Sequence, residues 1–206
     1  MIITSIERQK KNRRRVSLFL DGAFAFGVNE DVVYRYGLCK GMELGEPLRR
    51  EIEEYDNRVQ AKIVAERLIA TRMRSEQEIR EHLVLKGFPE EIADETINDF
   101  RRVRLLDDGE FARAWIRDRL RLRPRAAAML RVELRRKGVA DMLIDQALGE
   151  LFADKDEAEI ARELADSYCR KHPGLDGIVL KRRLASFLQR KGFSASVVYP
   201  VIENVE

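Results

Sequence analysis

The chain has few of the residues that build metal sites, disulfide frameworks or nucleophilic active sites. Its 206 residues include only two cysteines and two histidines. Cys39 and Cys169 lie far apart and neither belongs to a Cys-x-x-Cys pair, so neither a thiolate zinc site nor a disulfide framework is indicated. His82 and His172 have no partner at metal-ligand spacing, and we interpret both as surface or helix-end residues. We expect reduced thiols, no cofactor and no enzyme activity.

Long apolar runs and glycine-rich phosphate loops are also missing. No segment approaches the roughly 20 apolar residues that span a bilayer, and the N-terminus has no signal-peptide core. We therefore expect a cytoplasmic protein. The carboxylates of Asp107, Asp108 and Glu110 would suit a divalent cation, although helix capping explains the same residues. A metal-dependent enzyme that uses this region stays open as an alternative.

Charge is abundant but nearly balanced. The 39 basic and 36 acidic residues leave a net charge of only +3, so the total does not indicate a nucleic-acid partner. The local distribution is uneven, because residues 113–137 contain ten basic and two acidic residues, whereas residues 141–166 contain nine acidic and two basic ones. The arginines of the basic segment either bind phosphates or carboxylates of a partner or pair with the acidic segment that follows.

The candidate partner-binding residues come from this basic segment and from a second basic cluster near the N-terminus. That second cluster would contact nucleic acid or an acidic protein, or would only protect a sheet edge. The candidates are Arg113, Arg117, Arg121, Arg125, Arg131, Arg135, Arg136 and Lys137 of the basic segment, with Arg13, Arg14 and Arg15 of the cluster.

The first forty residues have a β-type pattern. Asp21-Gly22 separates two alternating runs and predicts a hairpin at about residues 13–28. Since a lone hairpin is marginal in water, we expect it to pack on the rest of the chain or to gain a third strand from Ile2 to Ile6. Asn29 is a suitable N-cap for a short helix through Tyr36.

A helical pattern begins at Pro47 and runs to Met73. It predicts either one long helix or two helices that break near Asp56-Asn57. Ser75 and Glu78 form a capping-box pattern at the start of the next helix. Asp107 and Asp156 are comparable starts for later helices.

Internal repetition dominates the rest of the chain. Lys86-Gly87-Phe88, Lys137-Gly138-Val139 and Lys191-Gly192-Phe193 stand 51 and 54 residues apart. Apolar residues lie at matching positions eight and four residues before each glycine and five and ten residues after it. A glycine that follows such a pattern can end a helix in the left-handed conformation, so each copy predicts a helix, a stop and a second helix, preceded by a further amphipathic helix.

We therefore predict a mainly α protein of three tandem three-helix repeats forming an elongated curved body, with a small N-terminal β-hairpin extension. The expected parts are an extension over residues 1–46 and repeats over residues 47–106, 107–153 and 154–206. The repeated glycines are interpreted as backbone features rather than phosphate contacts. Trp115, the only tryptophan, is interpreted as a packing residue.

These motifs, in this order, resemble the RecX family. The resemblance rests on Ser75 to Arg80 with Leu83 and the first Lys-Gly-Phe, on Leu106-Asp107-Asp108 with Phe111, Trp115 and Arg119, and on Glu133-Leu134 with Lys137-Gly138-Val139. It covers about residues 58–206, and the N-terminal segment resembles an extension found in some members. One departure is visible, because residues 121–125 lack the glycine commonly found before the middle helix of the second repeat.

The resemblance implies a monomeric regulator that lies in the groove of the RecA filament on single-stranded DNA. Such a regulator contacts more than one protomer and inhibits strand exchange, ATP hydrolysis and coprotease activity. The alternative is a stand-alone helical DNA-binding protein, which would act through its arginine-rich helices and bind DNA without RecA.

Overall fold

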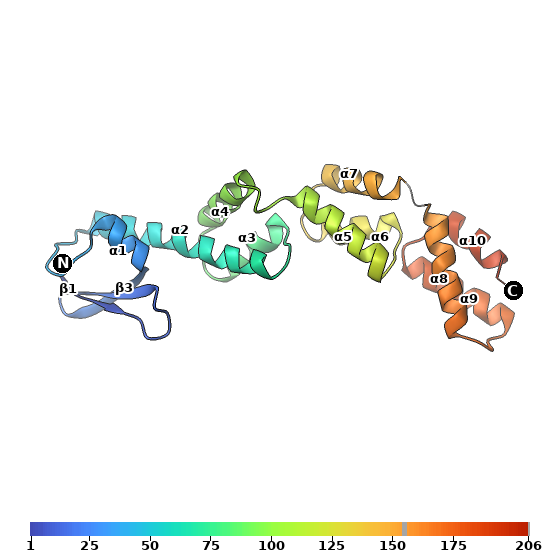
Figure 1. The fold of residues 1–206 in the computed structure, drawn as a ribbon, viewed down its shortest axis with the longest axis horizontal. Helices are drawn as coiled ribbons and strands as arrows, with labels where there is room; N and C mark the ends of the chain where they lie inside the picture. The colour runs from blue at the N-terminus through green and yellow to red at the C-terminus, as the bar shows by residue number, and fades with distance from the viewer. Residues whose placement is uncertain (154–155, 206) are drawn as a thin grey trace. The chain divides into compact units, whose positions relative to one another are not determined.

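The computed structural model describes residues 1–153 and 156–205. Figure 1 shows the elements in chain order, a small sheet first and helices after it. The described chain divides into two compact units. The first comprises residues 1–72 and 79–105, and the second comprises residues 73–78 and the part from Leu106 onward.

A three-stranded antiparallel sheet opens the first unit. Strands β1 (Ile3–Arg8) and β3 (Ala23–Asn29) flank β2 (Arg15–Leu20). Asp21 and Gly22 both have positive φ, as the hairpin turn requires. The predicted hairpin and its third strand are therefore confirmed. Apolar residues alternate along β2, so that Val16, Leu18 and Leu20 are buried.

Two helices cover the buried side of this sheet. The short α1 (Glu30–Tyr36) begins at Asn29, whose side chain accepts the Asp31 backbone N–H, and ends at Gly37 with φ 59°. The long α2 (Glu46–Thr71) is continuous through Asp56, so the prediction of a single helix is correct and the break is not formed. Its residue Ile52 belongs to the sheet core, and its later turns pack against α4.

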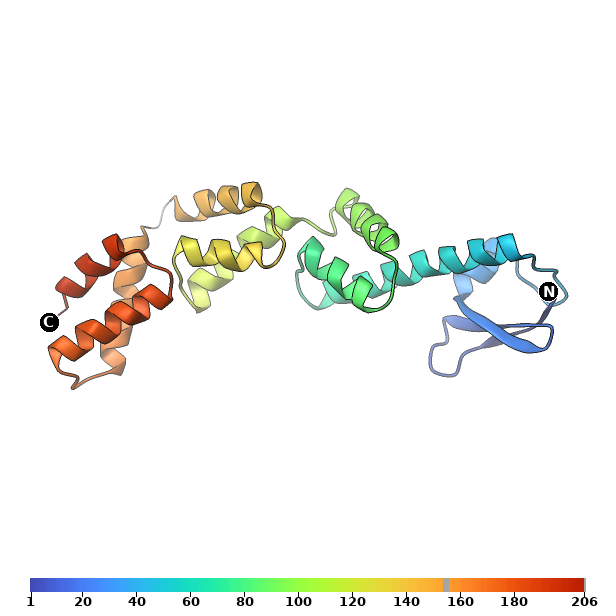
Figure 2. The same ribbon diagram turned by 180° about the vertical axis from the view of Figure 1, so that it is seen from behind.

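The remaining helices form the predicted three-helix pattern. With α2 stand α3 (Glu76–Leu85) and α4 (Glu90–Arg102); next come α5 (Asp108–Leu122), α6 (Ala127–Arg135) and α7 (Asp141–Phe152); last are α8 (Glu157–Lys171), α9 (Gly177–Arg190) and α10 (Ala195–Glu203). In the second and third sets the apolar faces of the helices meet in a buried core. In the reverse view of Figure 2 the orange to red helices α8, α9 and α10 lie side by side, and all three pack on one another.

The three repeated glycines end the middle helix of each set. Gly87, Gly138 and Gly192 have φ of 88°, 78° and 92°. In all three copies the residue after the glycine donates its N–H to a buried leucine carbonyl five residues back, Leu83, Leu134 or Leu188. This is the hydrogen bond of a glycine helix stop, and the structural interpretation of these glycines is confirmed.

Candidate protein and nucleic-acid interface

Most arginines of the basic segment are engaged within the second unit. On α5, Arg113 donates to Glu150 of α7 at 2.6 Å and pairs with Glu110 at 3.0 Å. On α6, Arg135 pairs with Asp141 at 2.6 Å, and Arg131 pairs with Asp145. Arg121 lies 3.5 Å from Asp118. The acidic partners from α7 are the ones that the intramolecular alternative required.

These pairs perturb the acid groups in the expected direction. The hydrogen bond from Arg135 holds the pKa of Asp141 below its ordinary value, and the hydrogen bond from Arg113 does the same for the pKa of Glu150. All four side chains are substantially exposed or lie at the surface, so each pair contributes little stability. What the pairs do achieve is to neutralise guanidinium groups that would otherwise attract a partner.

Glu133 of α6 contacts Trp115 and two further arginines of the basic segment. It accepts the Nε1–H of Trp115 at 2.9 Å and the Nε–H of Arg119 at 2.8 Å, and it pairs with Arg125. The Arg119 guanidinium lies 4.1 Å from the centre of the Trp115 ring, which also packs against Phe111. Trp115 is thus a packing residue with a polar handle, and its indole N–H is already used.

Two candidates in the basic segment differ from the rest. Arg117 on α5 and Arg136 after α6 are exposed, and neither forms an ion pair with any residue that the structure describes. Lys137, in contrast, is engaged with Glu78 at 2.5 Å. Arg123 of the same segment is also exposed and has no ion pair among the described residues, so the segment offers three unneutralised guanidinium groups to a partner instead of the continuous basic surface that the sequence indicates.

The three arginines of the N-terminal basic cluster differ in their contacts. Arg15 faces inward, donating to the Gly27 carbonyl and to Asp56 at 3.1 Å. Asp56 is buried and also accepts the Asn29 backbone N–H at 2.6 Å, while burial raises the pKa of its carboxyl. Arg15 is thereby a structural residue. Arg13 and Arg14 are exposed and stay candidates for partner contact.

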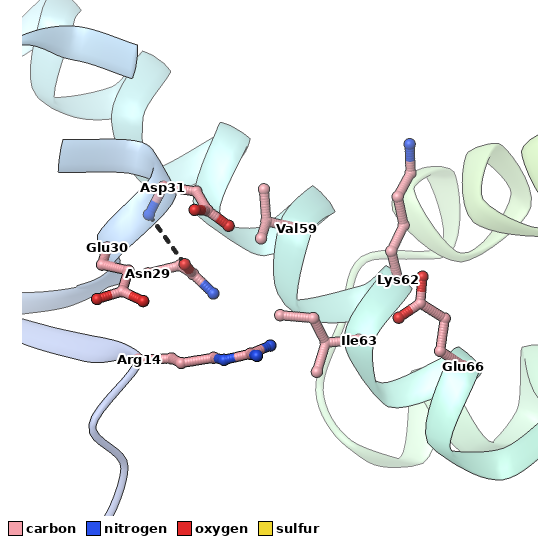
Figure 3. Close-up of a pocket in the computed structure, with 8 residues that line it drawn as sticks. All are labelled: Arg14, Asn29, Glu30, Asp31, Val59, Lys62, Ile63 and Glu66. Carbon is pink, nitrogen blue, oxygen red and sulfur yellow. Dashed lines mark hydrogen bonds between the residues drawn. The ribbon is translucent and has the colours of Figure 1, made fainter. Parts of the chain in front are cut away.

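Arg14 also lines a cavity of about 500 Å³ between the sheet and α2. Figure 3 shows its guanidinium opposite Ile63, with Val59 on the same helix. The rest of the lining carries both signs of charge, from Glu30, Asp31, Lys62 and Glu66, with Asn29. A cavity of mixed charge and small apolar area does not favour one ligand class.

A basic group that the sequence analysis missed lies on the last repeat. Residues 177–202 contain five basic residues and no acidic one, and four of the five lie on α9: Lys181, Arg182, Arg183 and Arg190. Within the described chain none of the four has an ion pair, although Lys181 donates to the Glu203 carbonyl at 3.5 Å. The absence of acidic residues over this stretch was the available signal, but the higher density of arginine in residues 113–137 obscured it.

The candidate metal cluster is explained by capping. The Asp107 side chain accepts the Glu110 N–H at 3.0 Å, and Asp108 accepts the Glu76 N–H at 2.9 Å. No group of three or more metal-binding side chains is placed to hold an ion in the described residues. In the same part of the chain, no helix is both long and apolar enough to cross a bilayer. His172 stacks on Tyr168 at the end of α8.

Two of the Lys-Gly turns that end middle helices contact the first turn of the middle helix of the preceding repeat, and we call each of these contacts a joint. At the first, Ser75 Oγ donates to the Lys137 carbonyl at 2.6 Å, and Gln77 lies directly over Gly138. At the second, the Ala126 N–H donates to the Lys191 carbonyl at 3.1 Å, and a Cβ at Gly192 would stand 2.7 Å from Met129 Cβ. Ser75 and Ala126 each immediately precede a middle helix.

Glycine is required at Gly138 and Gly192 for a second reason besides its positive φ, which is the lack of space for a Cβ. In each joint a Lys-Gly turn receives the first turn of the preceding middle helix, whose side chain would overlap any Cβ on the glycine. Residues 121–125, which lack the expected glycine, comprise the end of α5 and the start of the loop that leads into the second joint. Where this loop ends, the Ala126 N–H donates to Lys191 and the Ala127 N–H donates to Glu157 at 2.7 Å.

Comparison with known proteins places each part of the chain. Residues 1–45 match the regulatory protein RecX N-terminal domain. The first, second and third three-helix domains of RecX match residues 61–100, 107–148 and 155–202.

Full-length relatives agree with these matches. The regulatory protein RecX of Bacillus velezensis is 34% identical over 99% of this chain and 77% of its own length, and that of Clostridium beijerinckii is 31% identical over 98% and 95%. A crystal structure of a regulatory protein RecX, 30% identical, covers 99% of both chains with a TM-score of 0.71. The RecX structure from Lactobacillus salivarius, 21% identical with a TM-score of 0.63, has the same fold over 72% of this chain. The chain belongs to the RecX family of regulatory proteins.

Proposed function

We propose that this chain binds the RecA filament assembled on single-stranded DNA and inhibits its strand exchange, ATP hydrolysis and coprotease activities. The observation that carries the proposal is the set of four RecX domain matches, which together extend from residue 1 to residue 202. Similar helical units in series offer several equivalent contact surfaces, which suits a partner that is itself a polymer.

The ion pairs indicate which residues attract the filament. An arginine that already pairs with a carboxylate of its own chain gains little from a second acceptor, whereas an exposed unpaired one retains its full attraction. We assign this role to Arg182 and Arg183 on α9 and to Arg117 and Arg136 in the second repeat.

The test is co-sedimentation with RecA filaments on single-stranded DNA. The double variant Arg182→Glu/Arg183→Glu should bind about tenfold more weakly, a loss of about 1.4 kcal/mol, with an unchanged unfolding midpoint. Its control is Arg49→Glu/Arg50→Glu on α2, where two adjacent arginines form their ion pairs among the described residues with Glu53 and Glu46 one turn away, and Arg49 also lies over the Phe26 ring. The control should bind filaments as the unmodified chain does.

Bare single-stranded DNA separates the proposal from its alternative. If the chain sediments equally well with bare DNA, and if this binding falls steeply with salt, it is a stand-alone DNA-binding protein. Binding to neither DNA nor filaments would contradict both functions.

A further inference from the structure

The first repeat carries the same Lys-Gly turn as the two joints, but its turn is uncovered. Lys86 and Gly87 are exposed, and apart from Gly87 and its two chain neighbours no described residue has an atom within 4 Å of a Cβ built on Gly87. Gly87 has nearly the same φ as Gly138 and Gly192, and the hydrogen bonds that close the turn are the same. The surface is therefore preformed, and only the helix that would cover it is missing.

The two covered copies define what fits such a turn. Both accept a hydrogen bond on the lysine carbonyl from the residue at the start of a helix, and both hold a first-turn side chain against the glycine. At the first joint the lysine ammonium also pairs with Glu78, three residues after Ser75. The Lys86 ammonium has no partner among the described residues, and its neighbour Leu85 is 83% exposed, which adds an apolar contact.

A second copy of this chain does not supply the missing helix. The first turns of α3 and α6 already cover Gly138 and Gly192. In the last repeat α9 begins at Gly177, about one turn earlier relative to its glycine. Leu180, which stands twelve residues before Gly192 as Ser75 stands before Gly87, is only 8% exposed. With all three middle helices of a second copy excluded, we take the occupant to be a helix of another protein.

We propose that the turn at Lys86-Gly87 is a docking site for the first turn of a helix of a partner protein. The partner helix carries a hydrogen-bond donor at its N-cap, such as Ser or Thr, and an acidic residue three positions later. The donor binds the Lys86 carbonyl, the carboxylate binds the Lys86 ammonium, and a first-turn side chain lies on Gly87. This proposal stands independently of RecA, because it concerns the chemistry of the contact and not the identity of the partner.

The chain itself supplies the probe. A helix-constrained peptide of residues 72–85, with Ile79→Ala and Leu83→Ala to remove its buried apolar residues, carries the Ser75 and Glu78 pattern. The control peptide has Ser75→Ala and Glu78→Lys in addition. Each is titrated into the isotopically labelled full chain, and the backbone amide resonances of residues 86–88 and 137–139 are followed by NMR.

The expected result is a saturable shift of the resonances of Lys86, Gly87 and Phe88. The control peptide should bind about three- to tenfold more weakly, the range expected for the loss of a hydrogen bond and a surface ion pair. In the chain, Lys86→Glu should weaken binding of the first peptide by a similar factor, whereas Lys40→Glu at another exposed lysine should not. No saturable shift at residues 86–88, equal affinity for both peptides, or shifts confined to residues 137–139 would each overturn the proposal.

Discussion

At the scale of single residues, Glu133 shows how one carboxylate organises a helical repeat. Burial by itself raises the pKa of Glu133, but the hydrogen bonds from Arg119 and Trp115 outweigh it, so its pKa lies below the usual 4.5. A lowered pKa means that the ionised carboxylate stabilises the folded state at pH values above about 4.5. This contribution is lost as the pH falls through the lowered value.

We expect Glu133→Gln to reduce the free energy of unfolding by about 2 kcal/mol at pH 7, because two guanidinium groups lose the negative charge and an amide NH2 replaces one of the two acceptor oxygens. The difference from the unmodified chain should shrink as the pH is lowered from 4.5 toward 3. Urea unfolding followed by Trp115 fluorescence measures both quantities. Glu163→Gln, at an exposed glutamate of α8, is the matched control and should behave as the unmodified chain. A constant difference at all pH values would contradict this account of Glu133.

Asp56 has the opposite linkage to pH. Burial raises its pKa above the usual 3.8 more than Asn29 and Arg15 lower it. The folded state therefore binds the proton more tightly than the unfolded chain, and the stability contributed by this group falls as the pH rises from 3.8 through the raised pKa.

Removing the Asp56 side chain should nevertheless be costly at pH 7. Asp56→Ala leaves the Asn29 N–H and the half-buried Arg15 without their acceptor, and we expect a loss of about 2 to 3 kcal/mol. Thermal unfolding followed by far-UV circular dichroism measures this loss. Glu66→Ala, at an exposed residue on the same helix, should change the melting temperature little. Equal effects of the two substitutions would show that the buried contacts of Asp56 are unimportant.

At the scale of the elements, the three glycine turns separate two reasons for needing glycine. Alanine at Gly87 meets only the strain of positive φ, about 1 to 2 kcal/mol. Alanine at Gly138 meets the same strain and in addition overlaps Gln77, which adds about 1 to 3 kcal/mol. Gly138→Ala should therefore destabilise the chain clearly more than Gly87→Ala in urea unfolding. Equal losses in the free energy of unfolding would mean that Gln77 moves away from the new Cβ at residue 138 without destabilising the chain.

The elements were largely predictable because their signals are local. A cap such as Asn29, a stop such as Gly37 and the turn at Asp21-Gly22 each act within a few residues. Contacts between distant segments were not predictable, because spacing along the chain says nothing about which carboxylate a given arginine meets. Arg131 and Arg117 have equivalent patterns in the sequence, yet only Arg131 meets an aspartate from α7. For the same reason the pairing of Arg15 with Asp56, 41 residues away, was not predictable.

At the scale of the whole molecule, the division into two compact units predicts how the chain unfolds. Asp56 lies in the first unit, and Trp115 lies in the second. Chains that contain several compact units often depart from two-state unfolding. We expect Asp56→Ala to lower the unfolding midpoint measured by circular dichroism while leaving the midpoint measured by Trp115 fluorescence unchanged. Equal shifts of the two midpoints would show that the described chain unfolds as one cooperative body.

The helix α2 has a consequence for how this protein can be dissected. The RecX N-terminal domain matches up to residue 45 and the first three-helix domain from residue 61, so the first half of α2 belongs to neither. Yet Ile52 in that half is fully buried against the sheet, and later turns pack on α4. A shortened protein that starts at residue 46 would bare an apolar stripe to water and would tend to aggregate. The sheet and the first helical repeat are therefore best produced together.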